Sequence, residues 1–178
     1  MTPIRTLVLA LVVALLAGCS TLIAEKDNRA IAKDQQFAVV PLLNLSETPQ
    51  AGDKAASILA AVLRAEGVMD VRLYLPPEGN LLTGDNQQRQ SDAIAEARAN
   101  GAQIIVAGTV EEWRYKAGQD NEPAVGVTLM VSETGSQQSL LWTGTAARTG
   151  WGRDGLGTTG RDVLEDLVQS MPLTAGSN

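Results

Sequence analysis

The sequence predicts an α/β (α+β) fold in which a single mixed β-sheet of about five strands packs against about three helices. Two observations lead to this prediction. Short apolar segments alternate with amphipathic segments in the first half of the chain, which favours parallel strands joined by crossovers. Three strand-like segments joined by turns follow, which favours an antiparallel meander before a last helix. The predicted order of elements is therefore β-α-β-α-β-β-β-α.

The first half of the domain begins with a buried strand. Residues 37–43 are apolar and branched, and Pro41, which cannot donate a ladder hydrogen bond, marks the end or the edge of this strand. Residues 53–66 carry their apolar side chains on one helical face, and Gly67 ends the helix. The elements that follow are a strand over 71–75, a long loop over 76–90 and a short helix over 92–100.

The second half contains three strands and the last helix. In order, these elements are strands over 103–116, 125–131 and 140–148 and a helix over 159–171. The first of these strands alternates between two faces, one with Val110, Glu112 and Arg114 and the other with Glu111, Trp113 and Tyr115. This alternation keeps the two glutamates apart, so they cannot act as a carboxylate pair. The last helix begins with a predicted capping box of Thr159 and Asp162.

The N-terminal residues have the pattern of a secretory signal. Arg5 precedes an apolar run over 7–16, and small residues follow it. The run is shorter than the roughly 20 residues that a membrane-spanning helix needs. The stretch Leu16-Ala17-Gly18-Cys19 resembles the lipobox of bacterial lipoproteins, in which the cysteine is acylated and becomes the first mature residue. The alternative is an ordinary secretory signal with a chance cysteine.

The lipobox resemblance divides the chain into three parts. Residues 1–18 are a lipoprotein signal peptide, 19–36 are the lipidated Cys19 and a polar linker, and 37–178 are a periplasmic domain. Ser20, in place of aspartate, implies sorting to the outer membrane. A lipoprotein cysteine carries several acyl chains, palmitate among them, and two or more chains hold a protein stably on a membrane. We therefore expect a domain anchored at the periplasmic face of the outer membrane, with no cofactor beyond the lipid on Cys19.

The composition excludes several classes of function. The chain has 178 residues and a net charge of −6, and removal of the one basic residue of the leader makes it −7. An acidic domain is a poor partner for nucleic acid. The chain has no histidine and a single cysteine, which excludes the usual zinc sites, Ser-His arrangements and thiol catalysis after lipidation. We expect no enzymatic activity, no catalytic residues and no metal.

Several stretches resemble one family of envelope lipoproteins. The opening strand and turn, Ala38 to Ser46, resemble domains similar to the N-terminal domain of TolB, which also occur in CsgG and LpoB. The segments Glu112-Trp-Arg-Tyr-Lys116 and Arg148-Thr-Gly-Trp-Gly-Arg153 resemble the PelC family, and the likeness extends over 37–171. The resemblance implies a TolB-like fold and a homo-oligomeric, dodecameric ring under the outer membrane. It also implies the β-barrel exporter PelB as a partner, export of the cationic biofilm polysaccharide Pel, and no enzymatic activity.

Two other functions remain as alternatives. The first is a periplasmic activator of a peptidoglycan synthase, similar to LpoB, but such reach requires a longer disordered tether than residues 19–36 provide. The second is a self-sufficient pore similar to CsgG, but this would require further strands of about 9–11 residues to cross the bilayer.

Trp151 is the first candidate site residue. It lies in a glycine-rich loop, flanked by Arg148 and Arg153. Tryptophan is favoured at the interface between membrane and water, and arginine side chains can reach headgroups beside it. We therefore predict that these three residues contact the outer-membrane surface, with Trp151 folded back onto the sheet as the alternative. Trp113 and Trp142 lie inside strand patterns, which favours core or subunit-contact roles for both.

Asp120 and Glu122 in the turn before the second meander strand are the second candidates. A purely structural interpretation is that their side chains accept hydrogen bonds from backbone amides of the turn. In a ring, however, one carboxylate is repeated at a single radius, and rings of Asp or Glu attract cations. We predict that they line an opening that attracts a cationic polysaccharide. Glu78 and Asp85 in the long loop are weaker candidates for the same role.

The segment Gly155 to Gly160 matches G-x-G-x-x-G but does not predict a nucleotide site. A dinucleotide fold needs a helix after the motif and an acidic residue on a second strand about 20 residues further on, but only 18 residues follow Gly160 and the last helix takes most of them. The glycines are instead interpreted as shaping the Trp151 loop and the start of the last helix.

Overall fold

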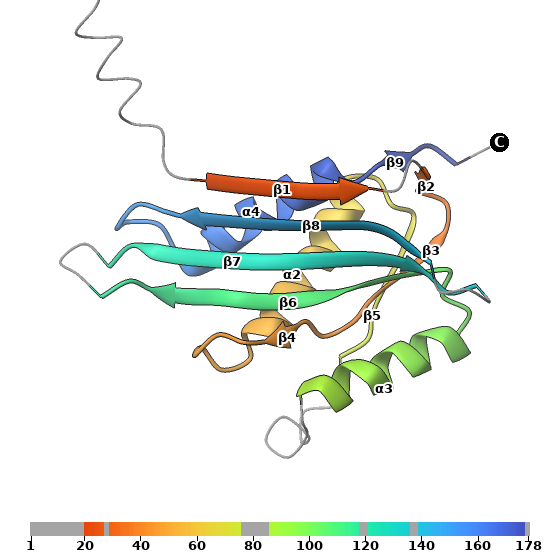
Figure 1. Cartoon of the computed structure of the whole chain (residues 1–178), viewed down its shortest axis with the longest axis horizontal. Coiled ribbons are helices and arrows are strands. Elements are labelled where there is room, and N and C mark those ends of the chain that lie inside the picture. Colours follow the sequence, from red (N-terminus) through yellow and green to blue (C-terminus); the bar gives the residue numbers. More distant parts are fainter. Residues whose placement is uncertain (1–19, 27–28, 76–85, 118–120, 136–138, 177–178) are drawn as a thin grey trace, which may run out of the picture.

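The structure is a computed structural model that describes residues 20–26, 29–75, 86–117, 121–135 and 139–176. One twisted sheet crosses the molecule and carries helices on its two faces (Figure 1). The elements before the meander are β1 Ser20–Lys26, β2 Ile31–Ala32, β3 Gln36–Val39, β4 Leu43–Asn44, α2 Ala51–Ala65, β5 Asp70–Leu73 and α3 Asn86–Ala99. The remaining elements are β6 Ile104–Tyr115, β7 Pro123–Glu133, β8 Leu140–Thr149, α4 Leu156–Ser170 and β9 Leu173–Thr174.

The mixed sheet that the sequence predicts is confirmed, and it is larger than expected. Its seven strands follow the order β1-β8-β7-β6-β3-β5, with β4 pairing with β6 beyond the end of β3. Strand β3 is parallel to both β5 and β6, as the two crossovers require. Strands β6, β7 and β8 form the predicted antiparallel meander.

The main correction to the predicted fold concerns the segment that we expected to be a linker. Residues 20–26 do not form a linker: they form β1, which pairs along its whole length with β8 at the edge of the sheet. Strand β2 pairs with β9, so the segment before β3 is fixed to the last residues of the fold. Ile31 is fully buried, which explains why an otherwise polar segment packs. The described fold therefore includes strands before Phe37, in the segment predicted to be a linker.

A β-bulge corrects the predicted alternation in β6. The pairing with β7 shifts between Val110 and Glu112, so that Glu111 is an extra residue on β6. As a result Val110 and Trp113, three positions apart, both face the main core. The prediction that Glu111 and Glu112 lie on opposite faces is wrong. Both side chains bind residues on the face of the sheet that is opposite the main core. Glu111 accepts a hydrogen bond from the Thr109 hydroxyl, and Glu112 accepts one from Arg114 Nε at 2.9 Å.

The predicted capping box of the last helix is also wrong. Helix α4 begins at Leu156, one turn earlier than expected, with Gly155 as the N-cap. Thr159 is a buried residue of the first turn, and its hydroxyl lies 3.4 Å from the Gly155 carbonyl oxygen four residues back. Helix α3 likewise begins at Asn86, so its first residues replace the end of the predicted loop.

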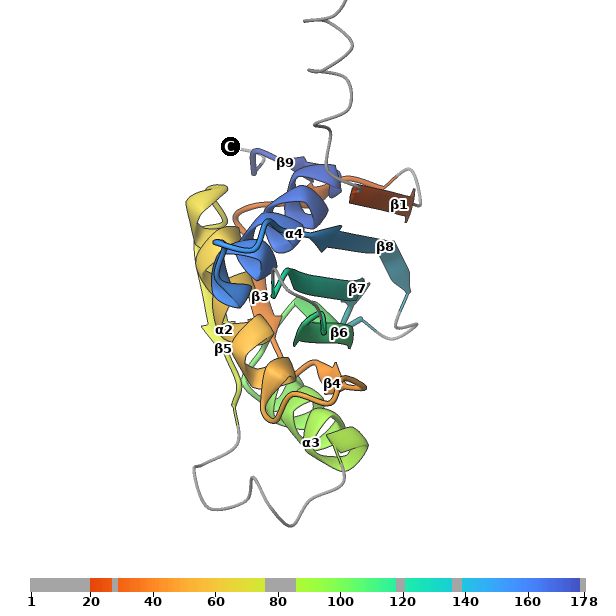
Figure 2. The ribbon, with the colours of Figure 1, turned by 90° about the vertical axis from the view of Figure 1, so that its left-hand side faces the viewer.

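The main core lies between the sheet and helices α2 and α4, which cover the same face (Figure 2). Leu59 and Leu63 of α2 and Leu164 and Leu167 of α4 are fully buried there. Helix α3 covers only part of the opposite face, over a small cluster of mostly short apolar side chains: Ala38, Val40, Ala93, Ala97, Ala102 and Ile105. Among the described residues, no helix is both long and apolar enough to span a membrane.

Two tryptophans pack against glycines in the main core. Trp113 is 3% exposed and Trp142 is 1% exposed, so the predicted core positions are confirmed. A Cβ atom on Gly160 would overlap the Trp113 indole, and one on Gly144 would overlap the Trp142 indole. Gly160 thus belongs to the packing of α4 on the sheet, which gives the last glycine of the G-x-G-x-x-G match a structural role.

Candidate functional site

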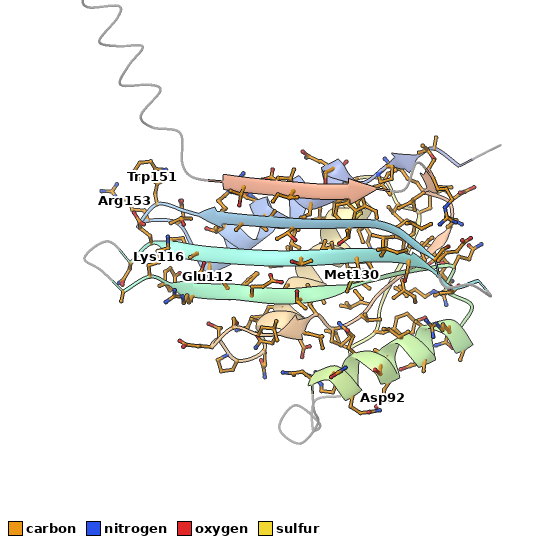
Figure 3. All side chains as sticks on the ribbon, viewed as in Figure 1. Asp92, Glu112, Lys116, Met130, Trp151 and Arg153 are labelled. Atoms are coloured by element: carbon orange, nitrogen blue, oxygen red, sulfur yellow. The ribbon has the colours of Figure 1, made fainter. Side chains whose placement is uncertain are left out.

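The turn between β8 and α4, residues 150–155, presents Trp151 at one end of the sheet. Its side chain is 62% exposed, whereas the other two tryptophans are buried. In Figure 3, Trp151 and Arg153 lie together beyond the end of the strands. The alternative in which Trp151 folds back onto the sheet does not agree with this exposure.

The backbone of the turn is fixed although the indole is exposed. The Asp154 carboxylate accepts a hydrogen bond from the Trp151 N–H at 2.7 Å, and the Asp154 N–H donates to the Trp151 carbonyl oxygen at 2.8 Å. Gly150 donates to the Pro123 carbonyl oxygen at 2.8 Å, which ties the turn to β7. A Cβ atom on Gly150 would lie 2.7 Å from the Thr159 hydroxyl, so this close approach requires glycine. The turn therefore holds a large aromatic side chain outward on a rigid support.

The two flanking arginines differ in their surroundings. The Arg148 guanidinium binds the carboxylates of Asp162 and Asp166 on α4, with Nη1–Oδ2 and Nη2–Oδ2 distances of 3.2 and 2.7 Å. Arg148 therefore fastens β8 to α4, and its predicted contact with the membrane surface stays a prediction. Arg153 is exposed and lies near Trp151 (Figure 3). Of the two, Arg153 is exposed, whereas Arg148 is partly buried and paired with α4.

A polar cavity of about 330 Å³ lies between this turn and the start of α4. Its lining residues are Arg148, Thr149, Gly150, Trp151, Asp154, Thr159 and Asp162. The charges of this lining already pair within the protein, since Arg148 binds Asp162 and Asp154 binds the turn backbone. The cavity is thus part of the support of the turn.

The turn that carries the predicted acidic residues lies at the same end of the sheet. Lys116 Nζ donates to the Thr149 hydroxyl at 2.8 Å, and the Lys116 N–H donates to the Glu122 carbonyl oxygen at 2.8 Å. The Glu122 side chain is half-buried. Asp120, Glu78 and Asp85 lie outside the described residues, so their predicted roles stay predictions.

The first strand starts at this end too. Ser20 pairs with Arg148, three residues before Trp151, and Thr149 pairs with Ala124 of β7. Cys19 lies outside the described residues, but it directly precedes Ser20 in the chain. The predicted lipidation site therefore directly precedes a strand that begins beside the Trp151 turn.

The described residues contain no group of three or more side chains that could hold a metal ion. Among these residues the one carboxyl group with a resolved pKa shift, Asp70, lies at the far end of the sheet. A hydrogen bond from Gln36 Nε2 at 2.8 Å and the nearby Arg72 lower the pKa of Asp70 below its ordinary value. This shift therefore belongs to the pairing of β3 with β5 and not to the Trp151 turn.

Two solved structures of PelC dodecamers from Paraburkholderia phytofirmans are similar to this chain. One, of a variant with a single leucine-to-methionine substitution, is 36% identical with a TM-score of 0.73. The other is 36% identical with a TM-score of 0.72. In both comparisons 89% of this chain and 100% of the other chain are covered. The chain belongs to the PelC family.

PelC membership confirms the resemblance and the fold that the sequence predicts, over most of the chain. No protein-family model matches the chain, and no curated protein matches it. The solved PelC proteins are dodecamers, so family members self-associate.

Sequence reasoning missed two parts of this PelC site. It did not find Asp154, which caps the Trp151 turn, although the dipeptide Asp154-Gly155 is typical of turns. It also missed β1, for which the run Thr21-Leu22-Ile23 was the available signal.

Proposed function

We propose that this protein is an outer-membrane lipoprotein, anchored through Cys19, that forms a homo-oligomeric ring and assists export of the cationic polysaccharide Pel. The exporter PelB would be its β-barrel partner, and the exported polymer would contribute to the biofilm matrix. The proposal rests on membership of the PelC family, whose solved members are dodecamers. A dodecamer is the assembly that we propose for this chain.

One observation carries the membrane orientation. Strand β1 starts at Ser20, which pairs with Arg148, and the exposed Trp151 lies at the same end of the sheet. A lipid on Cys19 would bring that end of the sheet to the bilayer. An exposed indole beside an exposed arginine suits the membrane interface, because the ring can be buried while its N–H stays hydrated. The anchor and the aromatic side chain would then act on the same surface.

The acidic turn supports the conduit role. Glu122 lies between β6 and β7, Asp120 precedes it by two residues in the sequence, and a ring repeats each carboxylate around one axis. The net charge of −6 agrees with attraction of a cationic polymer. Electrostatic attraction of the polymer without a tight binding site suits a component through which the polymer passes.

Trp151→Ala tests the membrane part of the proposal. The variant is expected to bind liposomes several-fold more weakly and to export less polymer, with a nearly unchanged thermal midpoint. Met69→Ala is the matched control, because Met69 is 80% exposed and lies next to β5 at the other end of the sheet. Equal liposome binding by Trp151→Ala and the parent protein would contradict the orientation.

Asp120→Lys tests the conduit part. Assembly is expected to persist, measured by light scattering, while polymer secretion falls. Asp92→Lys, on the exposed side of α3, applies the same charge change away from the turn and should secrete normally. Normal secretion by Asp120→Lys would remove the acidic turn from the proposal.

A further inference from the structure

The sheet has an outer face that its own helices leave largely uncovered. Helices α2 and α4 pack on the opposite face, and α3 covers β3, β4 and the first half of β6. Figure 2 shows no helix over β1 and β8 on this side, within the described part of the chain. We call the uncovered region the open face, with these residues: Thr21, Ile23, Thr109, Gly126, Thr128, Met130, Thr143, Thr145 and Ala147.

The strand register fixes these residues in rows across the sheet. Thr109 pairs with Thr128, Thr128 with Thr145, and Thr145 with Ile23. A second row contains Gly126, Ala147 and Thr21. The open face is therefore a continuous surface over four strands, and Figure 1 looks directly onto it.

The open face has no charged side chain on β7 or β8. Its residues there are Gly126, Thr128, Met130, Thr143, Thr145 and Ala147. Two apolar side chains on it are exposed, with Met130 at 41% and Ile23 at 71%. Charged residues begin at the rim, where Glu25 of the edge strand β1 pairs with Thr143, and where Glu112 and Arg114 of β6 form an ion pair with an Nε–Oε1 distance of 2.9 Å. An uncharged centre with a polar rim is the composition of a protein interface.

Four of the five threonine hydroxyls of the open face, those of Thr109, Thr128, Thr143 and Thr145, have hydrogen-bond partners within the sheet. The Thr128 and Thr145 hydroxyl oxygens lie 3.0 Å apart and share a hydrogen bond, and the Thr143 hydroxyl donates to the Leu129 carbonyl oxygen at 3.1 Å. Thr109 donates to Glu111. Because these four hydroxyls have partners, they can lose their water at little cost. What it offers a partner is mainly methyl groups and backbone.

We propose that the open face is the surface on which a second copy of this chain docks. This inference rests on the proposed function, in which the chain forms a ring like its dodecameric relatives. Four strands about 4.8 Å apart and about seven residues long give an area on the order of 400 Å². A standard interface buries roughly 800 Å² on each partner, so the open face supplies about half of one side. A closed ring requires two different patches on each copy, and this face is one of them.

Introducing one positive charge in the centre of the open face tests the proposal. The full-length chain, purified in detergent, is measured by light scattering over a range of concentrations. Met130→Lys and Thr145→Lys are each expected to raise the concentration at half-assembly at least tenfold, because a lysine would be buried without a partner. Met130→Leu should assemble as the parent protein does.

Met69→Lys is the matched control, since it makes the same substitution at an exposed methionine outside the open face. It should leave assembly unchanged, and the thermal midpoint of every variant confirms folding. If the parent protein is an oligomer and both lysine variants on the open face assemble as Met69→Lys does, the docking surface is wrong while the ring stands. If the parent protein is a monomer at all concentrations, the ring of the proposed function fails, and this inference fails with it.

Discussion

The two faces of the sheet are covered in different ways. On one face, α2 and α4 bury leucines against the sheet and against each other, in a continuous apolar core. On the other, α3 contributes only two buried side chains, Ala93 and Ala97. A helix with so little apolar surface gains little from burial, so other contacts must hold α3 in place.

Polar contacts at its first turn hold α3. Arg89 Nη2 of α3 lies 2.8 Å from Asp53 Oδ2 of α2, so this ion pair links the helices of the two faces beside β4. The two side chains are 12% and 16% exposed. Gln90 Nε2 donates to the Pro41 and Gly108 carbonyl oxygens at 2.8 and 3.1 Å. One face is thus a hydrophobic core, whereas the other is covered by a helix fastened at one end. The two should therefore respond differently to substitution.

The largest effect is expected in the helix-covered core. Leu164→Ala removes a fully buried side chain of α4 and should lower the free energy of unfolding by about 3 kcal/mol. Urea denaturation followed by circular dichroism measures it. A loss below about 1 kcal/mol would mean that α4 is not part of the cooperative core.

Gly160→Ala tests how closely α4 packs on the same face of the sheet. Its added methyl group would overlap the Trp113 indole and should destabilise the fold by about 2 kcal/mol, despite the better helix propensity of alanine. Gly157→Ala in the same helix meets no atom within 4 Å and should stabilise it by about 0.5 kcal/mol. Opposite signs in urea denaturation are the expected outcome; two equal effects would show that the indole adapts freely.

Arg89→Ala tests the fastening of α3. It leaves Asp53 largely buried without its partner and should cost about 1.5 kcal/mol. Hydrogen exchange should accelerate selectively in α3, while α2 and α4 keep their protection. Arg98→Ala, at an exposed position near the end of the same helix, should leave both quantities unchanged. Uniform acceleration over all three helices would refute an α3 that opens by itself.

The smallest effect is expected in the pH dependence of stability that comes from Asp70, where β3 pairs with β5. Because the pKa of Asp70 is lowered in the folded state, its contribution to stability is present above its unfolded pKa and is lost as the pH falls through the folded pKa. Gln36→Leu removes the main cause and should raise the pKa of Asp70 in an NMR titration. The titration should be the same in Arg89→Ala. A changed titration there would show that α3 and this edge are coupled.

The sequence predicts most of the sheet because periodicity is a local property. The meander and both crossovers follow from apolar runs, turns and Gly67 alone. The bulge at Glu111 does not follow, because it depends on β7 pairing and on Trp113 reaching the core. Strand β1 was missed because its side chains Thr21 to Ala24 are exposed, so burial leaves no signature on them. Its pairing partner, β8, lies more than 100 residues later in the chain.

The candidate site was only partly predictable for a similar reason. Glycines around Trp151 indicate a loop, but the exposure of the indole depends on the Asp154 cap and on Gly150 approaching Thr159. The sequence likewise places Arg148 beside Trp151, and only the fold shows that two carboxylates of α4 bind it. Contacts between distant elements decide both points.

The pairing of β1 with β8 has a mechanical consequence. The ladder runs from Ser20 opposite Arg148 to Lys26 opposite Trp142, and it begins at the first described residue. A pull on the chain at position 19, directed along the strand, would load all the hydrogen bonds of this ladder together, in shear. The same pull directed across the strand would break them one after another, starting from Ser20. The direction of tension at that point would therefore decide how much force the domain withstands.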